Sequence, residues 1–338
     1  MSDRSTPLRV LVVTNMYPTP QTPAFGAFVE TEVNAIRRLD GGAAAVVELV
    51  FVNGREHLAA YLRAPYQIRE IVRRRNIDVV HAHYGLTGFV AAFHDVPLVV
   101  TFHGDDLWGT RTPSGGISTK SRVARWFSYS VASRADAIIC HSEELRSALP
   151  RAADRARAHV IPMGVDTNRF TPGKREAARQ RLGQPTDQRL VLFPVSAMQP
   201  VKRLDLAQAA VNLVRGRGMN ARLWIVTGVS PAAMPDYYRA ADCLLVTSDR
   251  ESGPVVVKEA LCCDLPVVSV DVGDAARWLD LARGCRVVSR DPPDIADGLW
   301  QVLQESRAIN GAHVRSEISA DRIATGIVDV YRSVLKAL

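Results

Sequence analysis

The chain has 338 residues, of which 47% are hydrophobic and 23% are charged, and these values are typical of a soluble globular protein with two domains. No apolar run approaches the roughly 18 residues that cross a bilayer, and residues 1–7 lack the apolar segment of a signal peptide. Five cysteines without metal-ligand spacing indicate reduced thiols, so we expect a cytoplasmic protein.

The formal net charge of +7 favours anionic partners. No basic tract is interleaved with aromatic residues as in nucleic-acid-binding proteins, so we expect no nucleic-acid partner. The basic surface would also suit peripheral docking at the inner face of a membrane, where each cation near anionic lipid contributes roughly 1 kcal/mol. A plainly solvated surface explains the same charge, and we favour that simpler interpretation.

The amino-terminal half alternates buried strands with helices, which is the pattern of a doubly wound α/β domain. An apolar run over Leu8–Thr14 predicts the first strand, and a proline-rich loop then leads to a helix over Ala27–Arg38. No Gly-x-Gly-x-x-Gly follows this strand, which argues against a dinucleotide-binding fingerprint. Further strands are predicted at 44–52, 78–83, 97–101 and 137–140, and helices at 118–134 and after an N-cap at Ser142.

Histidines stand near the carboxyl ends of two predicted strands, where open α/β sheets bind ligands. His81 and His83 alternate onto one face of their strand, and His103 lies in the loop after the next strand. A metal site needs more ligands than this pattern supplies, so we expect no metal. His83 could line a cleft, whereas His81 fits a hydrogen-bonded core position. Asp105 and Asp106 fit polar or helix-capping roles.

Proline and glycine punctuate the stretch 160–172, which predicts a domain boundary. The first domain would span residues 1–165, and the second would span residues 166–318, followed by an amphipathic run at 319–338. The second domain should open with a strand at 189–194 and a helix from Leu204, followed by strands at 223–228 and 243–248.

The most informative stretch begins just after the strand at 243–248. It reads Glu251-Ser-Gly-Pro-Val-Val-Val-Lys-Glu259, in which glycine and proline predict a turn and a helix that starts near Pro254. A further buried strand at 265–270 completes a βαβ unit. The turn of this unit therefore lies at the carboxyl edge of the sheet, where open α/β sheets bind ligands.

This turn and helix start offer polar groups that fit a sugar nucleotide. The N–H groups of Ser252, Gly253 and Val255 should be free, and the positive end of the helix suits a diphosphate. Glu259 lies more than one turn into the helix, where its carboxylate could accept hydrogen bonds from the paired hydroxyls of a ribose. Glu251 lies in the turn, where a sugar could bind. Taken singly, each glutamate is more simply explained as a solvated surface charge.

Together, the two glutamates and their surroundings closely resemble the donor-site motif of retaining, nucleotide-sugar-dependent glycosyltransferases of family 4. The continuation over residues 265–274 looks like the branch that contains teichuronic-acid biosynthesis enzymes. The resemblance covers nearly the whole chain and is strongest over residues 240–274. It implies a GT-B fold, in which two Rossmann-like domains face a cleft and the final helix, at about 319–338, returns to the first domain.

The resemblance implies roles for further residues. His103, in the sequence Thr-Phe-His, would contact the transferred sugar and act with Glu251 in catalysis. Gly26, at the junction of a loop and a helix, would bring the backbone close to the acceptor and the donor phosphate, although simple turn chemistry explains it equally well. Val229 and Met234 lie where the family reads the nucleotide base.

The donor diphosphate would be bound by cations from the loop after the strand at 189–194. Lys202 matches a lysine of the family, but Ala197 stands where the family usually has an arginine. An exposed helix start contributes only about 0.3–1 kcal/mol per charge, which is too little to hold a diphosphate. We therefore predict that Arg203 replaces the missing arginine.

The resemblance thus implies a retaining glycosyltransferase that moves a hexose-type sugar from a nucleotide diphosphate donor, UDP in preference to GDP, to an acceptor hydroxyl. A carbohydrate, a lipid-linked sugar and a small molecule all fit as acceptor. The reaction would need no cofactor or metal, and the leaving phosphate would take the acceptor proton on the front face. Two alternatives stay open: another GT-B reaction, such as epimerisation or phosphorolysis, and a catalytically silent subunit that binds a sugar nucleotide.

Overall fold

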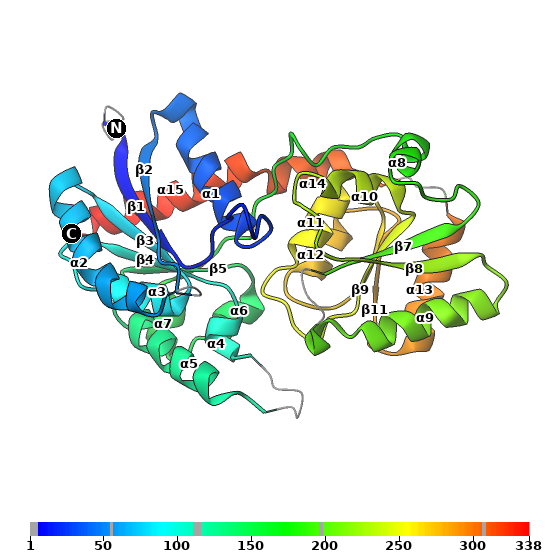
Figure 1. Ribbon diagram of the computed structural model, residues 1–338, viewed down its shortest axis with the longest axis horizontal. Helices are drawn as coiled ribbons and strands as arrows, with labels where there is room; N and C mark the ends of the chain where they lie inside the picture. The colour runs from blue at the N-terminus through cyan, green and yellow to red at the C-terminus, as the bar shows by residue number, and fades with distance from the viewer. Residues whose placement is uncertain (1–5, 55–56, 111–115, 196–198, 306–308, 338) are drawn as a thin grey trace. The chain divides into compact units, whose positions relative to one another are not determined.

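The computed structural model describes residues 6–54, 57–110, 116–195, 199–305 and 309–337. The chain divides into two compact units, one of Met1–Gly164 with Ala320–Leu338 and one of Val165–Ser319. Each unit is built on a parallel β-sheet with a hydrophobic core on both faces (Figure 1). The predicted α/β class with two Rossmann-like domains is confirmed.

The sheet of the first unit has the strand order β2-β1-β3-β4-β5-β6. Its strands are β1 (Leu8–Thr14), β2 (Ala45–Phe51), β3 (Val79–His83), β4 (Leu98–Phe102), β5 (Ala137–Cys140) and β6 (Ala158–Val160). The side chains of β3, β4 and β5 are buried along their whole length, because helices cover the sheet on both sides. Continuous β-branched and aliphatic runs in the sequence follow from this double burial.

Helices of the first unit form two layers (Figure 1). One layer consists of α1 (Ala27–Arg38) and α15 (Ala320–Lys336), whose apolar side chains share one core. The predicted return of the final helix to the first unit is confirmed by its packing against α1. The remaining helical segments are η1 (Leu39–Gly42), α2 (Ala59–Arg75), α3 (Gly85–Ala91), α4 (Asp105–Trp108), α5 (Thr119–Ala132), α6 (Glu143–Ser147) and α7 (Ala152–Ala156).

The sheet of the second unit has the strand order β11-β10-β9-β7-β8. Its strands are β7 (Arg189–Pro194), β8 (Ala221–Val226), β9 (Cys243–Val246), β10 (Val267–Val270) and β11 (Arg286–Val288). One face packs on α9 (Leu204–Gly216) and α13 (Pro292–Gln304). The other helical segments are α8 (Arg175–Arg181), η2 (Pro200–Lys202), α10 (Met234–Ala240), α11 (Val255–Cys262), α12 (Ala275–Asp280) and α14 (Gly311–Ile318).

Local signals predicted several element ends well. Ser142 caps α6 as expected, because its hydroxyl accepts a hydrogen bond from the N–H of Leu145 at 3.2 Å. The strand predicted at 223–228 lies two residues earlier, at Ala221–Val226, and Gly228 adopts a positive φ of 68° after it. In the described ranges, no helix combines the length and the apolar character needed to cross a membrane.

Candidate functional site

The turn at 251–254 joins β9 to α11 at the carboxyl edge of the second sheet. Pro254, with φ of −65°, is the N-cap of α11, and the helix begins at Val255 as the sequence predicted. Gly273, which follows β10, packs against this turn with φ of 61°. A Cβ atom at Gly273 would lie 3.0 Å from the carbonyl oxygen of Glu251 and 3.2 Å from the nitrogen of Gly253, so glycine permits the close approach.

Backbone donors remain open at the start of α11. Within the part of the chain that the structure describes, the N–H groups of Ser252, Gly253 and Val255 make no hydrogen bond. Such unsatisfied donors at a helix start suit an anion. The geometry therefore agrees with a diphosphate site here, which stays a prediction.

Glu251 is held by two neighbours at the same edge. Its Oε1 atom accepts hydrogen bonds from the Lys202 ammonium at 2.6 Å and from the Ser248 hydroxyl at 2.8 Å. The structure thus brings together Lys202, predicted for the diphosphate, and Glu251, predicted for the sugar. A cation and an anion lie side by side where phosphate and sugar of a donor would meet.

Arg203 is already paired with two carboxylates. Its guanidinium lies 2.8 Å from Asp205 and 3.1 Å from Asp249. These pairs neutralise much of the attraction that the side chain could offer a diphosphate. The position of Ala197, which raised the question of a substitute, lies outside the described residues.

Arg290 is a cation at this edge that the sequence analysis missed. It follows β11 by two residues and donates hydrogen bonds to the carbonyl oxygens of Ser248 at 3.2 Å, Asp249 at 3.3 Å and Asp271 at 3.1 Å. Among the described residues its partners are carbonyl dipoles rather than carboxylates, so they leave its charge unneutralised. An arginine soon after the short β-branched run at Val287 and Val288 was the signal that could have identified it.

Glu259 has a different environment from Glu251. The hydroxyl of Tyr238, on α10, donates to Glu259 Oε2 at 2.6 Å. Burial raises the pKa of Glu259 to about 7, although this hydrogen bond acts in the opposite direction. Since Tyr238 occupies Oε2, a ribose hydroxyl would bind at Oε1. The sequence assigned no role to Tyr238, because α10 carries it from outside the motif.

A buried ion pair anchors α11 to α12. Lys258, fully buried, lies 2.8 Å from Asp274, and the indole N–H of Trp278 donates to the same carboxylate at 2.7 Å. These contacts explain why the motif extends to Asp274. The side chains predicted to read the base, Val229 and Met234, pack against the same hydrophobic core.

Gly26 is required by the backbone at the start of α1. It adopts φ of 73°, and a Cβ atom would lie 2.3 Å from the carbonyl carbon of Met16. Its carbonyl oxygen accepts hydrogen bonds from the N–H groups of Val29 and Glu30. The turn thus needs glycine for steric reasons, and its contact with a ligand stays a prediction.

His103 lies between two other histidines in the first unit. Its Nε2 atom is 3.2 Å from His83 Nδ1, and its Nδ1 atom is 3.2 Å from His141 Nε2. Burial lowers the pKa of His103 well below its ordinary value. A sugar contact made by the ring would have to replace one of these two contacts.

Asp106 shapes the loop that carries His103. Its buried carboxylate accepts hydrogen bonds from the N–H groups of His103, Gly104 and Gly85 at 2.9–3.1 Å, and burial raises its pKa to about 7. The expected polar role is thus found in the loop itself, while the N-cap of α4 is Gly104.

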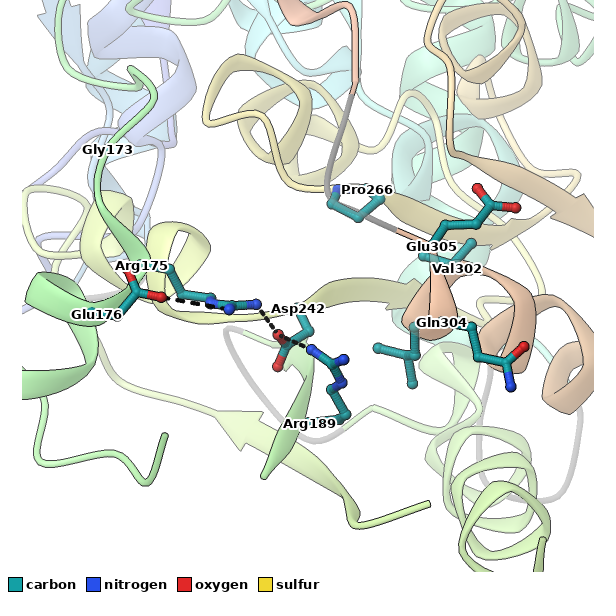
Figure 2. A pocket seen from close by; sticks show the side chains of 10 residues that line it. Gly173, Arg175, Glu176, Arg189, Asp242, Pro266, Val302, Gln304 and Glu305 are labelled. Carbon is teal, nitrogen blue, oxygen red and sulfur yellow. Dashed lines mark hydrogen bonds and ion pairs between the residues drawn. The ribbon is translucent and has the colours of Figure 1, made fainter. Parts of the chain in front are cut away.

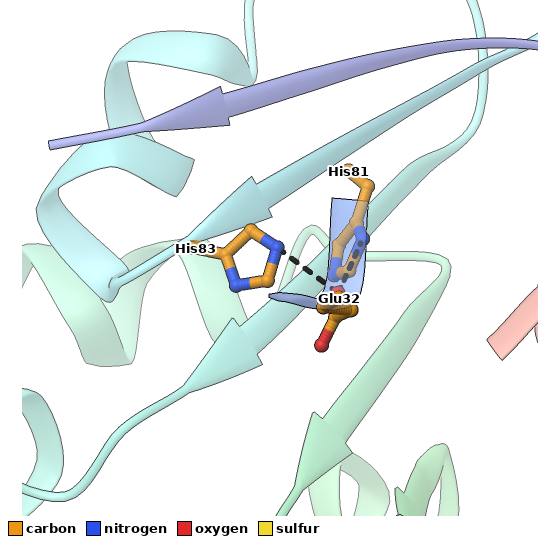
Figure 3. Close-up of side chains that lie close together, drawn as sticks. All are labelled: Glu32, His81 and His83. Atoms are coloured by element: carbon orange, nitrogen blue, oxygen red, sulfur yellow. Dashed lines mark ion pairs between the residues drawn. The ribbon is translucent and has the colours of Figure 1, made fainter. Parts of the chain in front are cut away.

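Glu32, His81 and His83 place potential metal-ligand atoms within 4.8 Å of one another (Figure 3). Glu32 was not predicted as a member of this cluster, because it lies on α1, far from the two histidines in sequence. Both ring nitrogens of His81 already have close partners, the hydroxyls of Tyr331 and Thr101, each at 2.7 Å. A metal would have to displace such a hydrogen bond, so the cluster is better explained without one.

A cavity of about 500 Å³ lies at the opposite edge of the second sheet (Figure 2). Arg189 opens β7, Asp242 precedes β9 and Pro266 precedes β10, so these lining residues mark the amino ends of the strands. Its polar groups pair with each other, since Arg175 lies 2.7 Å from Asp242. Sheets of this type bind ligands at the carboxyl edge, so the donor should not bind here.

Residues 8–169 match the family described as Glycosyltransferase Family 4, and residues 208–305 match Glycosyl transferases group 1. The D-inositol 3-phosphate glycosyltransferase of Xylanimonas cellulosilytica is 32% identical over 303 residues, which cover 77% of this chain and 72% of that protein. The protein of the same name from Geodermatophilus obscurus is 30% identical over 325 residues, 82% and 72% of the two chains.

Solved structures with similar folds include sucrose-phosphate synthase from Thermosynechococcus elongatus, with a TM-score of 0.75 and 16% identity. The match covers 98% of this chain and 100% of that one. Anabaena Alr3699/HepE in complex with UDP and glucose has a TM-score of 0.67 and 17% identity, and the match covers 96% and 100% of the two chains. This likeness shows that the chain has the GT-B fold.

Proposed function

The chain belongs to glycosyltransferase family 4 and transfers a sugar from a nucleotide-sugar donor, and from this premise we propose a retaining hexosyltransferase that uses a UDP-linked donor. The acceptor in this proposal is a hydroxyl group, and the reaction needs no metal. Catalysis is assigned to Glu251 and His103, and donor binding to the turn before α11.

One observation carries the proposal. At the carboxyl edge of the second sheet, the open N–H groups at the start of α11 lie between Glu251 with its partner Lys202 and the partly buried Glu259. A diphosphate fits the N–H groups and the lysine, a ribose fits Glu259, and the sugar fits Glu251. Each part of a sugar nucleotide therefore has a complementary group.

Names of similar proteins suggest the first compounds to test. The HepE structures contain UDP with glucose, or UDP-glucose, which supports a UDP-linked hexose as donor. The relatives described above are named for D-inositol 3-phosphate, which supports an inositol phosphate as acceptor. They do not support the finer resemblance to teichuronic-acid enzymes that the stretch 265–274 suggested.

The proposed mechanism relies on position and charge. The acceptor hydroxyl attacks the anomeric carbon from the face that the diphosphate leaves, and a leaving phosphate oxygen takes the hydroxyl proton. Lys202 and the N–H groups of α11 stabilise the negative charge that develops on the diphosphate. The Glu251 carboxylate faces the oxocarbenium-like sugar and stabilises its positive charge, so the protein supplies both signs without a metal.

The decisive experiment mixes the purified protein with UDP-glucose and D-inositol 3-phosphate in EDTA. We expect UDP release that requires the acceptor, and a product whose anomeric configuration, read from its NMR coupling constant, is that of the donor. Release of UDP without acceptor, an inverted product, or a strict need for Mn²⁺ or Mg²⁺ would contradict the proposal. A panel of other UDP-sugars and acceptors extends the test when this pair gives no turnover.

Peripheral membrane docking is supported by one surface of the first unit. Leu58, the N-cap residue of α2, and Leu62 and Tyr66 on the helix follow each other at intervals of four residues and are 81%, 85% and 73% exposed. Exposed arginines share this helix, namely Arg63, Arg69, Arg73, Arg74 and Arg75. An exposed apolar stripe among cations complements an anionic lipid surface.

A further inference from the structure

Three histidines and Glu32 form a continuous series of side-chain contacts at the carboxyl edge of the first sheet. His141 Nε2 lies 3.2 Å from His103 Nδ1, and His103 Nε2 lies 3.2 Å from His83 Nδ1. His83 Nε2 lies in turn 3.2 Å from Glu32 Oε1 (Figure 3). The catalytic candidate His103 is therefore in the middle of this series.

The carbonyl group of Ile161 sets the direction of the hydrogen bonds. It lies 3.0 Å from His141 Nδ1, and because a carbonyl only accepts, Nδ1 must carry the hydrogen. In neutral His141, Nε2 is then an acceptor and receives a hydrogen from His103 Nδ1. By the same rule His103 Nε2 is an acceptor and receives a hydrogen from His83 Nδ1.

This direction leaves two acceptors facing each other at the far end. If His83 were neutral, its Nε2 lone pair would point at the Glu32 carboxylate across 3.2 Å. Both atoms are buried, and among the described groups neither makes a well-formed hydrogen bond, even with the other. Two buried acceptors at this distance repel each other, so the contact requires one more proton.

We propose that Glu32 and His83 hold this additional proton as a carboxylate–imidazolium pair, and that the pair keeps His103 neutral with its hydrogen on Nδ1. Glu32, His83 and His141 are thus positioning residues that act through His103. The inference rests on the proposed function only in giving His103 a place beside the transferred sugar.

The charges around the series agree with this assignment. Burial raises the pKa of the Glu32 carboxyl, but the neighbouring histidines, His83 foremost, together outweigh burial and hold that pKa below its ordinary value. Burial and the neighbouring histidines hold the pKa of His103 well below its ordinary value. The other titratable groups that face the series are His81, whose pKa burial lowers to about 3, Tyr331 on α15 and Asp106 beside the His103 loop.

A neutral His103 suits the proposed chemistry. The transferred sugar gains positive charge in the transition state, and a proton on His103 would repel it. Holding the proton at Glu32 and His83 keeps that charge one ring further away. The nearby cavity, which Glu32 and His141 line, has a volume of about 10 Å³ and holds no more than about one water molecule.

Nitrogen-15 NMR of the full chain, labelled at histidine, tests the assignment in the free protein. At pH 7.5 we expect one ring, His83, with both nitrogens protonated, and two neutral rings, His103 and His141, with hydrogen on Nδ1. Single histidine variants assign the signals, and the exposed His57, His159 and His313 provide reference signals from outside the series. A neutral His83, a hydrogen on His103 Nε2, or signals that shift with Zn²⁺ or EDTA would overturn the proposal.

A matched pair of variants separates positioning from mere structure. In Glu32→Gln the side-chain amide can donate to His83 Nε2, so His83 should become neutral while His103 keeps its hydrogen on Nδ1. In Glu32→Ala no donor replaces the proton, and the fixed order of hydrogens should be lost. The control Glu70→Gln, on α2, removes a partly exposed carboxylate of the same unit that pairs with Arg74, and it should leave the spectrum unchanged.

Turnover should also be lowered more by Glu32→Ala than by Glu32→Gln. Because misplacing a reacting group by about 1 Å can reduce rates by roughly 10²-fold, we expect Glu32→Ala to lower kcat roughly tenfold. Glu32→Gln should remain within about threefold of the parent at neutral pH, since the order of hydrogens survives. Equal losses in both variants would contradict positioning through His103. The NMR result does not depend on turnover, so failure of the proposed transfer reaction and failure of this inference are distinguishable.

Discussion

Glu251 and Glu259 have different partners, and this difference predicts different effects of their removal. Glu259→Ala should weaken binding of UDP and of UDP-sugar alike, by about 1.5–3 kcal/mol, because both ligands carry the ribose. Glu251→Ala should leave UDP affinity unchanged and lower turnover, because only the intact donor carries the sugar. Lys202 would lose its ion-pair partner but could still bind the diphosphate. Calorimetry with UDP, combined with turnover, checks both. Equal loss of UDP affinity in the two variants would contradict these roles.

The raised pKa of Glu259 predicts a pH dependence. The pKa of Glu259 is about 7, above the ordinary 4.5. Between these two pH values the carboxyl group ionises in the unfolded chain but stays protonated in the folded protein, so the free energy of unfolding falls as pH rises. The residue therefore contributes a destabilising effect above pH 7 that disappears at low pH, and Glu259→Gln should unfold at higher denaturant than the parent at pH 8 but not at pH 4. Uridine affinity should rise between pH 6 and pH 8 in the parent, as the carboxylate forms, and stay flat in Glu259→Gln.

Three cations at the carboxyl edge of the second sheet should contribute unequally to diphosphate binding. Lys202→Ala should weaken UDP binding by about 1.5–3 kcal/mol relative to uridine. Arg203→Ala should cost about 1 kcal/mol or less, because Asp205 and Asp249 already neutralise its charge. Arg290→Ala should lie between the two. If Arg203→Ala weakens UDP as much as Lys202→Ala, Arg203 is the replacement that the sequence predicted.

At the scale of elements, the packing of α11 on α12 depends on a buried charge pair. Asp274→Ala would leave the fully buried Lys258 without its partner and should lower the free energy of unfolding by about 3–5 kcal/mol. Replacing both residues, as in Lys258→Met with Asp274→Leu, should be milder, because no unpaired charge remains.

Urea unfolding of the second unit measures these effects. The control Asp297→Ala breaks an exposed pair with Arg217 in the same unit, whose side chains are 57% and 39% exposed, and should change stability by about 1 kcal/mol or less. A loss at Asp274→Ala no larger than that of the control would show that the buried pair does not hold α11.

At the scale of the whole molecule, the net charge of +7 and the exposed side of α2 predict attachment to anionic lipid. Leu62→Ser should reduce co-sedimentation with vesicles that contain phosphatidylserine, and high salt should reduce it further by screening the arginines. Leu213→Ser, which removes a leucine that is 41% exposed on α9, is the matched control. Binding that is equal in both variants, or equal to neutral vesicles, would contradict docking through α2.

Sequence by itself determined the features that depend on neighbours along the chain. The bounds of β1 and β7 follow from apolar runs that need burial on both faces, and the start of α11 follows from Gly253 and Pro254 in the turn. The family motif also places Glu251 and Glu259 on one short segment. Local sterics and burial act within a few residues, so a linear pattern carries them.

Tertiary structure alone decided which side chains meet across the sheets. Strand order brings Lys202 to Glu251, and α10 brings Tyr238 to Glu259, although each pair is distant in sequence. It also joins α1 to β3 through Glu32 and His83. Such contacts depend on how strands are ordered and on which helix covers which face. A periodic pattern along the chain does not specify that order, whereas the requirement that every buried charge has a partner acts on the folded arrangement as a whole.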